Sequence, residues 1–163
     1  MRNPEGGNMS TKRILIVLMA VALTSVTVVK LQDAAKPEAD DRALIEQTAR
    51  DYIEGWYTAD AGRMERALHP DLVKRYVHTL PGGRQVLQSV TRDMMVEMTR
   101  MGGGSKTPAE RRNISVTVLE ISGDIAAVKT VSSEFFDYLS LAKCNGKWVI
   151  VNVLWRFQKP PSQ

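Results

Sequence analysis

Two runs of aromatic and β-branched residues dominate the hydrophobic pattern in the last third of the chain. They occupy residues 134–143 and 148–158. Between them, Asn145-Gly146 supplies the pair of residues that most readily adopts the positive φ angles of a type I′ turn. The pattern therefore predicts an antiparallel β-hairpin closed by a two-residue loop.

Counting outward from this turn assigns the hairpin side chains to two faces, because side chains alternate along a strand. Leu139 then pairs with Asn152, and Asp137 pairs with Leu154. Both faces are largely apolar, so we expect helices to cover one and an identical subunit to cover the other. One face holds Asp137, Leu139, Leu141, Trp148, Ile150, Asn152 and Leu154. The other holds Tyr138, Ser140, Ala142, Val149, Val151, Val153 and Trp155. We expect a homodimer through this second face, with Trp155 near its centre.

Helical periodicity occupies the first half of the presumed domain. Apolar residues recur at i, i+3 and i+4 in residues 42–58 and again from about 84 to 101, and Asp60 can cap a short helix between them. Strand patterns at 113–122 and 125–133 meet at Gly123-Asp124. Three helices followed by antiparallel strands predict an α+β domain over residues 39–158.

The N-terminal region has the layout of an export signal. Lys12-Arg13 precedes an uncharged apolar run at residues 14–29, which is long for a signal core and short for a transmembrane helix. We therefore expect residues 1–38 to comprise a signal peptide or a membrane anchor plus a linker, and the protein to be exported to the periplasm or secreted. Met1 or Met9 can be the start, and residues 159–163 are expected to be a frayed tail.

Charge and cysteine content exclude several classes of function. The chain has 22 Lys and Arg against 18 Asp and Glu, and these are interspersed rather than gathered into the basic stripe of a nucleic-acid-binding protein. The single cysteine, Cys144, excludes an internal disulfide. Nucleotide-binding glycine motifs are not found in the sequence, so no cofactor is expected.

Several sequence motifs resemble one known family. Two of these motifs lie in the helical half, Gly55-Trp56-Tyr57 and Met64 to Asp71. Three lie in the strands, Ser122 to Ala126, Asp137 to Leu141 and Asn145 to Asn152. Together they resemble the putative lumazine-binding branch of the nuclear transport factor 2-like (SnoaL-like) superfamily. The resemblance implies a cone-shaped fold with three N-terminal helices packed on a curved antiparallel sheet. It does not specify a reaction, because the superfamily includes isomerases, dehydratases, cyclases and oligomerisation domains.

Five residues are candidates for the cavity that such a fold contains. Asp137 and Asn152 share the predicted core face, where a carboxylate could act as a general base or pair structurally with Arg156 or a helix residue. Tyr52 and Trp56 lie one turn apart and could line a pocket or simply pack in the core. His69, before Pro70, could border the cavity mouth or cap a helix. The spacing of His69, Asp71 and His78 does not force a metal site, and none is expected.

These features favour an exported protein that binds a small molecule of unknown identity. An isomerase- or dehydratase-type enzyme with Asp137 as base remains an alternative, so enzymatic activity stays open and no catalytic residue is assigned. A noncatalytic dimerisation module with a vestigial cavity is the third possibility.

Overall fold

A computed structural model describes residues 38–158 of the chain. The chain divides into the units Met1–Asp40 and Asp41–Gln163, and the second of these contains the sheet and its helices. The expected export segment at residues 14–29 and the tail at 159–163 lie outside the described residues. Among residues 38–158, no helix combines the length and the apolar character needed to cross a membrane.

The predicted helical half is largely confirmed. A long helix ends at residue 58, and Ala59 then adopts a φ of 55°. The short helix α2 (Ala61–Ala67) follows, and the side chain of Asp60 caps it by accepting a hydrogen bond from Arg63 N at 2.9 Å. The third helix, α3 (Arg92–Arg100), is capped in the same way by Thr91.

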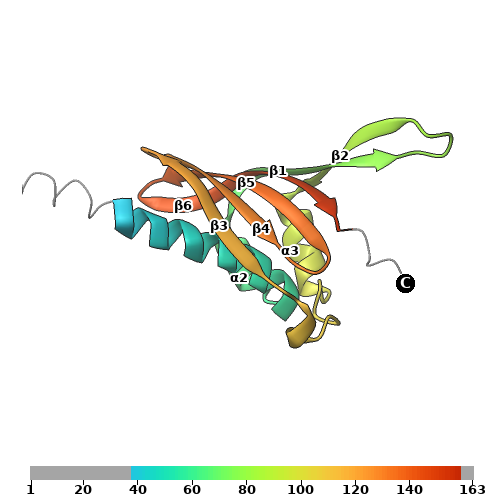
Figure 1. Ribbon diagram of the computed structural model, residues 1–163, viewed down its shortest axis with the longest axis horizontal. Coiled ribbons are helices and arrows are strands. Elements are labelled where there is room, and N and C mark those ends of the chain that lie inside the picture. The colour runs from blue at the N-terminus through green and yellow to red at the C-terminus, as the bar shows by residue number, and fades with distance from the viewer. Residues whose placement is uncertain (1–37, 159–163) are drawn as a thin grey trace, which may run out of the picture. The chain divides into compact units, whose positions relative to one another are not determined.

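The helices pack on one curved sheet (Figure 1). Within residues 38–158 this sheet has six strands in the order β2-β1-β6-β5-β4-β3. Neighbours are antiparallel except for β1 and β6, which run parallel. The expected α+β fold is therefore confirmed. The strands are β1 (Leu68–Thr79), β2 (Gln85–Thr91), β3 (Ser115–Ser122), β4 (Ile125–Val131), β5 (Phe135–Cys144) and β6 (Lys147–Phe157), with a 3-10 turn at Ala109–Arg111 before β3.

The expected helix from 84 to 101 is wrong over its first half. Gln85–Thr91 forms β2 and pairs with β1, so α3 begins only at Arg92. Val86 and Val90 are four residues apart, which places them on one face of a strand as well as on one face of a helix. Pairing with β1 satisfies the backbone hydrogen bonds of this segment and selects the strand.

The turn between β5 and β6 is of the predicted type. Asn145 and Gly146 have φ angles of 51° and 77°, and Lys143 pairs with Trp148 as expected. The predicted pairing of Leu141 with Ile150 is also confirmed.

Beyond Ile150 the expected register is wrong by one residue. A β-bulge leaves Val151 without a partner, so Ser140 pairs with Asn152 and Asp137 pairs with Trp155. Because the side-chain period of a strand is two, one extra residue exchanges the two faces of β6. Val153 is consequently fully buried, whereas Leu154 is 49% exposed.

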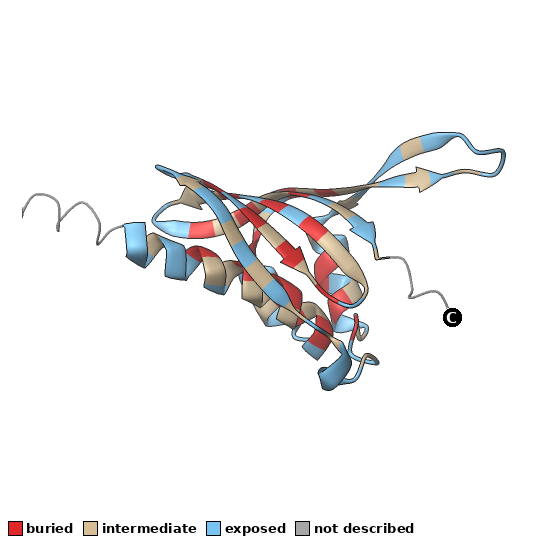
Figure 2. Ribbon diagram, viewed as in Figure 1, coloured by how far each residue is buried: buried red, intermediate tan, exposed pale blue. Residues whose placement is uncertain are grey.

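The core lies between the helices and the inner face of the sheet, where the buried positions gather in Figure 2. β4 alternates strictly, with Ala126, Val128 and Thr130 buried and the residues between them turned to the outer face. One side of the curved sheet therefore faces the helices, and nothing within residues 38–158 covers the other side.

The tight turn at Asn145-Gly146 gives a test of the register. Gly146→Val should lower the free energy of unfolding by about 1–3 kcal/mol, because a β-branched residue resists positive φ. A Cβ at this position meets no atom within 4 Å, so the cost comes from the backbone alone. Urea unfolding measures the change. Gly146→Asn is the matched control and should cost less, since Asn tolerates this conformation; equal losses for both variants would contradict the explanation.

Candidate functional site

A cavity of about 290 Å³ opens between the long helix, α3 and the inner face of the sheet. This volume is at the lower end of the range for small-molecule pockets, about 300–1,000 Å³. Ile53 and Met95 are buried where they line it, and Phe157, which is 60% exposed, marks its mouth. The lining residues are Tyr52, Ile53, Trp56, Lys74, Tyr76, Val90, Met95, Met98, Phe135, Trp155 and Phe157.

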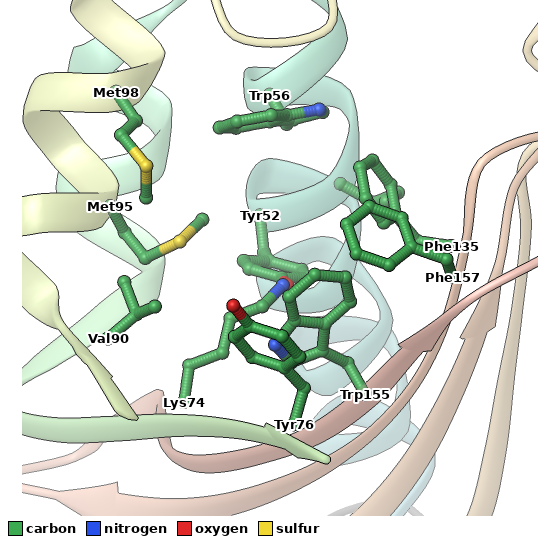
Figure 3. Close-up of a pocket in the computed structure, with 11 residues that line it drawn as sticks. Tyr52, Trp56, Lys74, Tyr76, Val90, Met95, Met98, Phe135, Trp155 and Phe157 are labelled. Atoms are coloured by element: carbon green, nitrogen blue, oxygen red, sulfur yellow. The ribbon is translucent and has the colours of Figure 1, made fainter. Parts of the chain in front are cut away.

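The cavity has two unlike walls (Figure 3). Met95, Met98 and Val90 form a flexible aliphatic side, whereas aromatic rings form the opposite side. The rings of Trp155 and Phe135 meet edge to face with centroids 5.5 Å apart. Flat apolar molecules are the ligands that such a pair of walls accommodates best.

Lys74 is the one charged residue among the described residues that line this cavity. Its Nζ donates to the Tyr52 hydroxyl and to Asp137 Oδ1, the latter at 3.1 Å. Tyr52 donates in turn to the same oxygen at 3.0 Å, and Thr130 Oγ1 donates to Asp137 Oδ2 at 3.2 Å. Asp137 is fully buried and Lys74 is 6% exposed, so the two charges compensate each other away from water.

Burial changes the acid–base properties of this network. Desolvation lowers the pKa of Lys74 below its usual value, although the charge of Asp137 opposes the change. Desolvation, reinforced by the charge of Asp137, holds the pKa of Tyr52 well above its usual value. Tyr52 therefore remains a neutral hydrogen-bond donor across the physiological range.

Aromatic rings also surround the Lys74 ammonium. Its Nζ lies 4.5 Å from the ring centroid of Trp155 and 5.8 Å from that of Phe135. Such cation–π contacts contribute about 0.5–2 kcal/mol each and partly offset the loss of hydration. They also place the nitrogen against the aromatic wall of the cavity.

Strand pairing explains how residues far apart in sequence meet here. Thr130 pairs with Asp137 between β4 and β5, and Asp137 pairs with Trp155 between β5 and β6. The parallel pairing of β1 with β6 sets Lys74 beside Val153. Tyr52 reaches the network from the long helix, so its hydroxyl ties the helix to the sheet.

The structure separates the five candidates predicted from the sequence. Tyr52 and Trp56 line the cavity. Asp137 lies under it, bonded to Tyr52 and Lys74, and is not part of its surface. Asn152 and His69 do not line it.

The β-bulge in β6 explains the position of Asn152, and the start of β1 explains that of His69. Asn152 is carried to the outer face and accepts a hydrogen bond from Arg75 Nη1 at 2.8 Å. His69 lies in β1, where its Nδ1 accepts from the backbone N of Asp71 at 3.1 Å. Of the two roles open to Asp137, general base or structural partner, the structure shows an ion pair, and the partner is Lys74 rather than Arg156 or a helix residue.

Sequence reasoning missed Lys74 and the aromatic wall. Leu72, Lys74 and Tyr76 alternate along β1, a strand-like signal that would have placed all three on one face. Trp155 was expected on the outer face because the bulge was not foreseen.

Gly104, which follows α3, holds Trp56 in position. Gly104 N donates to Trp56 O at 3.0 Å, and a Cβ at Gly104 would lie 2.7 Å from Trp56 Nε1. Only glycine permits this approach. The segment therefore acts as a support for the cavity wall.

Residues 40–156 match the family model described as putative lumazine-binding. The chain belongs to this family. The match covers nearly all of the described domain and agrees with the cone-shaped nuclear transport factor 2-like fold expected from the motifs. No protein with a curated description matches the sequence significantly.

Solved structures show the same fold. A nuclear transport factor 2-like protein of unknown function from Silicibacter pomeroyi DSS-3 has a TM-score of 0.59 at 19% identity, covering 74% of this chain and 98% of that chain. A nuclear transport factor 2-like protein of unknown function from Shewanella baltica OS155 has a TM-score of 0.57 at 18% identity, covering 74% and 96%. At these identities the likeness establishes the fold alone.

A double-mutant cycle tests whether Lys74 and Asp137 depend on each other. Lys74→Met or Asp137→Leu alone should each cost about 3–5 kcal/mol, because each leaves one buried charge without its partner. The double variant should cost clearly less than the sum, since both charges are gone. Urea unfolding gives the three values.

The partly exposed pair Lys143 and Asp41 provides the control for this cycle. Its nitrogen and oxygen are 2.7 Å apart, but both side chains are partly exposed. Lys143→Met should therefore cost no more than about 1 kcal/mol. Additive losses at Lys74 and Asp137 would show that the two side chains are not coupled.

Proposed function

We propose that this protein binds a small organic molecule with an apolar or aromatic body and one hydrogen-bond acceptor that meets Lys74. The observation that carries the proposal is the Lys74 nitrogen, the one charged group among the described residues that line an otherwise apolar, aromatic-walled cavity. The family description favours small-molecule binding in the same general sense.

The number of hydrogen bonds that Lys74 can still donate determines how strongly it can bind an acceptor atom of a ligand. An ammonium has three N–H donors, and the described residues supply two acceptors, Tyr52 and Asp137. One donor is left for a carbonyl, carboxylate or enolate oxygen of a ligand. A hydrogen bond to a charged donor contributes about 1.5–3 kcal/mol, enough to orient a small flat molecule.

Lumazine, the compound in the family description, is a reasonable first probe. It is a flat two-ring heterocycle with carbonyl oxygens, which suits the size of the cavity and its aromatic wall. Lumazine has more polar atoms than the cavity lining has polar groups to bind them. A less polar aromatic acid is therefore the better-matched second probe.

The alternative of an isomerase or dehydratase with Asp137 as base is less well supported. A general base must reach the proton that it removes. Both carboxylate oxygens of Asp137 already accept hydrogen bonds, from Tyr52, Lys74 and Thr130. Tyr52 and Lys74, rather than Asp137, line the cavity. We therefore favour a ligand-binding function over catalysis by Asp137.

We also propose that the protein forms a homodimer through the outer face of the sheet. Ile125, Tyr138 and Leu154 are 57%, 50% and 49% exposed on this face. Because of the bulge, Leu154 belongs to this surface and Trp155 does not. An apolar surface of this kind commonly marks an interface.

Export remains part of the proposal and rests on residues 1–38, with the basic pair Lys12-Arg13 before the apolar run. Fusing this segment to a reporter that is active only outside the cytoplasm should give activity. A silent fusion would refute export, and the size of the product would distinguish cleavage from anchoring.

Binding can be tested by titrating lumazine and 2-naphthoate against the intrinsic tryptophan fluorescence of the protein. We expect saturable binding of at least one of them, because Trp56 and Trp155 both line the cavity. Lys74→Met should weaken 2-naphthoate binding about 10- to 100-fold, the equivalent of one charged hydrogen bond.

Naphthalene and Lys143→Met serve as the matched controls. Naphthalene offers no acceptor, so its affinity should not fall in Lys74→Met. Lys143 pairs with Asp41 and does not line the cavity, so Lys143→Met should bind both compounds normally. Equal loss of both compounds in Lys74→Met would contradict the acceptor role.

Sedimentation of the purified protein tests the dimer. We expect a dimer at micromolar concentration that Leu154→Lys dissociates, because a lysine cannot be buried unpaired in an apolar interface. Leu44→Lys is the control, since Leu44 is 51% exposed on the long helix, which packs on the opposite face of the sheet. A wild-type monomer would refute the dimer, and a dimer that survives Leu154→Lys would place the interface elsewhere.

A further inference from the structure

The position of the Lys74 nitrogen on the cavity wall suits a nucleophile. It is the one amine on the cavity wall among the described residues, and it lies against aromatic rings rather than water. A carboxylate and a phenol, Asp137 and Tyr52, are both within hydrogen-bonding distance of it. An amine, an acid–base partner and a proton relay are the parts that imine formation requires.

We infer that Lys74 forms a reversible imine with an aromatic or conjugated aldehyde or ketone held in the cavity. This inference rests on the proposed binding function and specifies its ligand class, because only a carbonyl carbon beside Nζ can react in this way. The walls select the rest of the molecule: a cavity of about 290 Å³ with a methionine side and an aromatic side favours a flat body of one or two rings (Figure 3).

The first requirement is a neutral amine. Desolvation lowers the pKa of Lys74, and Asp137 Oδ1, 3.1 Å away, can take its proton. This transfer turns a buried ion pair into two neutral groups, which an apolar environment favours. Tyr52 and Thr130 keep the aspartic acid oriented by their hydrogen bonds.

The reaction then balances without any further reagent. The Lys74 lone pair attacks the carbonyl carbon, and the carbonyl electron pair moves to oxygen. One proton passes from nitrogen to that oxygen, for which the Tyr52 hydroxyl can act as relay. The protonated Asp137 passes a proton through the Tyr52 hydroxyl, which lines the cavity, to the resulting hydroxyl of the ligand. That hydroxyl leaves as water while the nitrogen lone pair forms the C=N bond.

The product keeps the charge balance of the free site. Lys74 ends as a protonated imine beside an Asp137 carboxylate, just as it began as an ammonium beside a carboxylate. The hydrogen bonds that Tyr52 and Thr130 give to Asp137 therefore need not change. Only one water is released, and attack by water on the C=N bond reverses the reaction.

Reductive trapping tests the inference on the full chain. The protein is incubated with 2-naphthaldehyde and sodium cyanoborohydride, then digested and mapped by mass spectrometry. We expect an alkylated Lys74 at least tenfold sooner than the exposed lysines Lys106 and Lys147. Excess 2-naphthoate should protect Lys74 in the wild-type protein, a control that does not depend on any variant folding.

Two variants separate the chemistry from the binding. Lys74→Arg keeps a positive charge but should give no adduct at this position. Tyr52→Phe should slow the trapping of Lys74, because Tyr52 acts through its hydroxyl as a positioning residue and relay.

The outcomes distinguish the two proposals. Saturable 2-naphthoate binding together with adducts spread evenly over Lys74, Lys106 and Lys147 would overturn the imine and leave the binding function standing. Absence of both binding and selective trapping would overturn both proposals. Selective, 2-naphthoate-protected trapping of Lys74 would support both.

Discussion

The buried ion pair between Lys74 and Asp137 is the interaction on which the rest of this domain depends. It joins β1 to β5, and Tyr52 and Thr130 extend the same network to the long helix and β4. A buried charge without a partner costs several kcal/mol, so all four elements must be in place before the pair is satisfied. The cavity exists because these elements meet around it.

Stability alone does not account for this pair. Apolar side chains of similar volume often serve as well as a buried ion pair or better. Here one member of the pair, Lys74, also lines a cavity that is otherwise apolar. Charged groups with altered pKa values in a cleft are more common at functional sites than elsewhere, and this is the physical basis for proposing that Lys74 contacts a ligand.

The sequence predicted the elements that local chemistry determines. The type I′ turn at Asn145-Gly146 follows from two residues that accept positive φ, and the Asp60 cap from a side chain that satisfies a helix terminus. Tyr52 was correctly assigned to the inner side of its helix because its neighbours have helical spacing. Motifs spread from Gly55 to Asn152 were enough to predict the fold.

The features that were not predicted depend on distant parts of the chain. Nothing near Val151 signals the bulge that turns Trp155 into the cavity and Asn152 out of it. Val86 and Val90 fit a helix as well as a strand until β1 is present to pair with them. Lys74 is buried because of Asp137, 63 residues away in sequence, and a lysine by itself predicts exposure.

A crystal structure of the protein in complex with 2-naphthoate tests most directly whether Lys74 orients a cavity ligand. We predict a ring system between Trp155 and Met98, with a carboxylate oxygen about 3 Å from Lys74 Nζ. A ligand whose carboxylate points out past Phe157, or one bound on the outer face of the sheet with the cavity unoccupied, would contradict this role for Lys74.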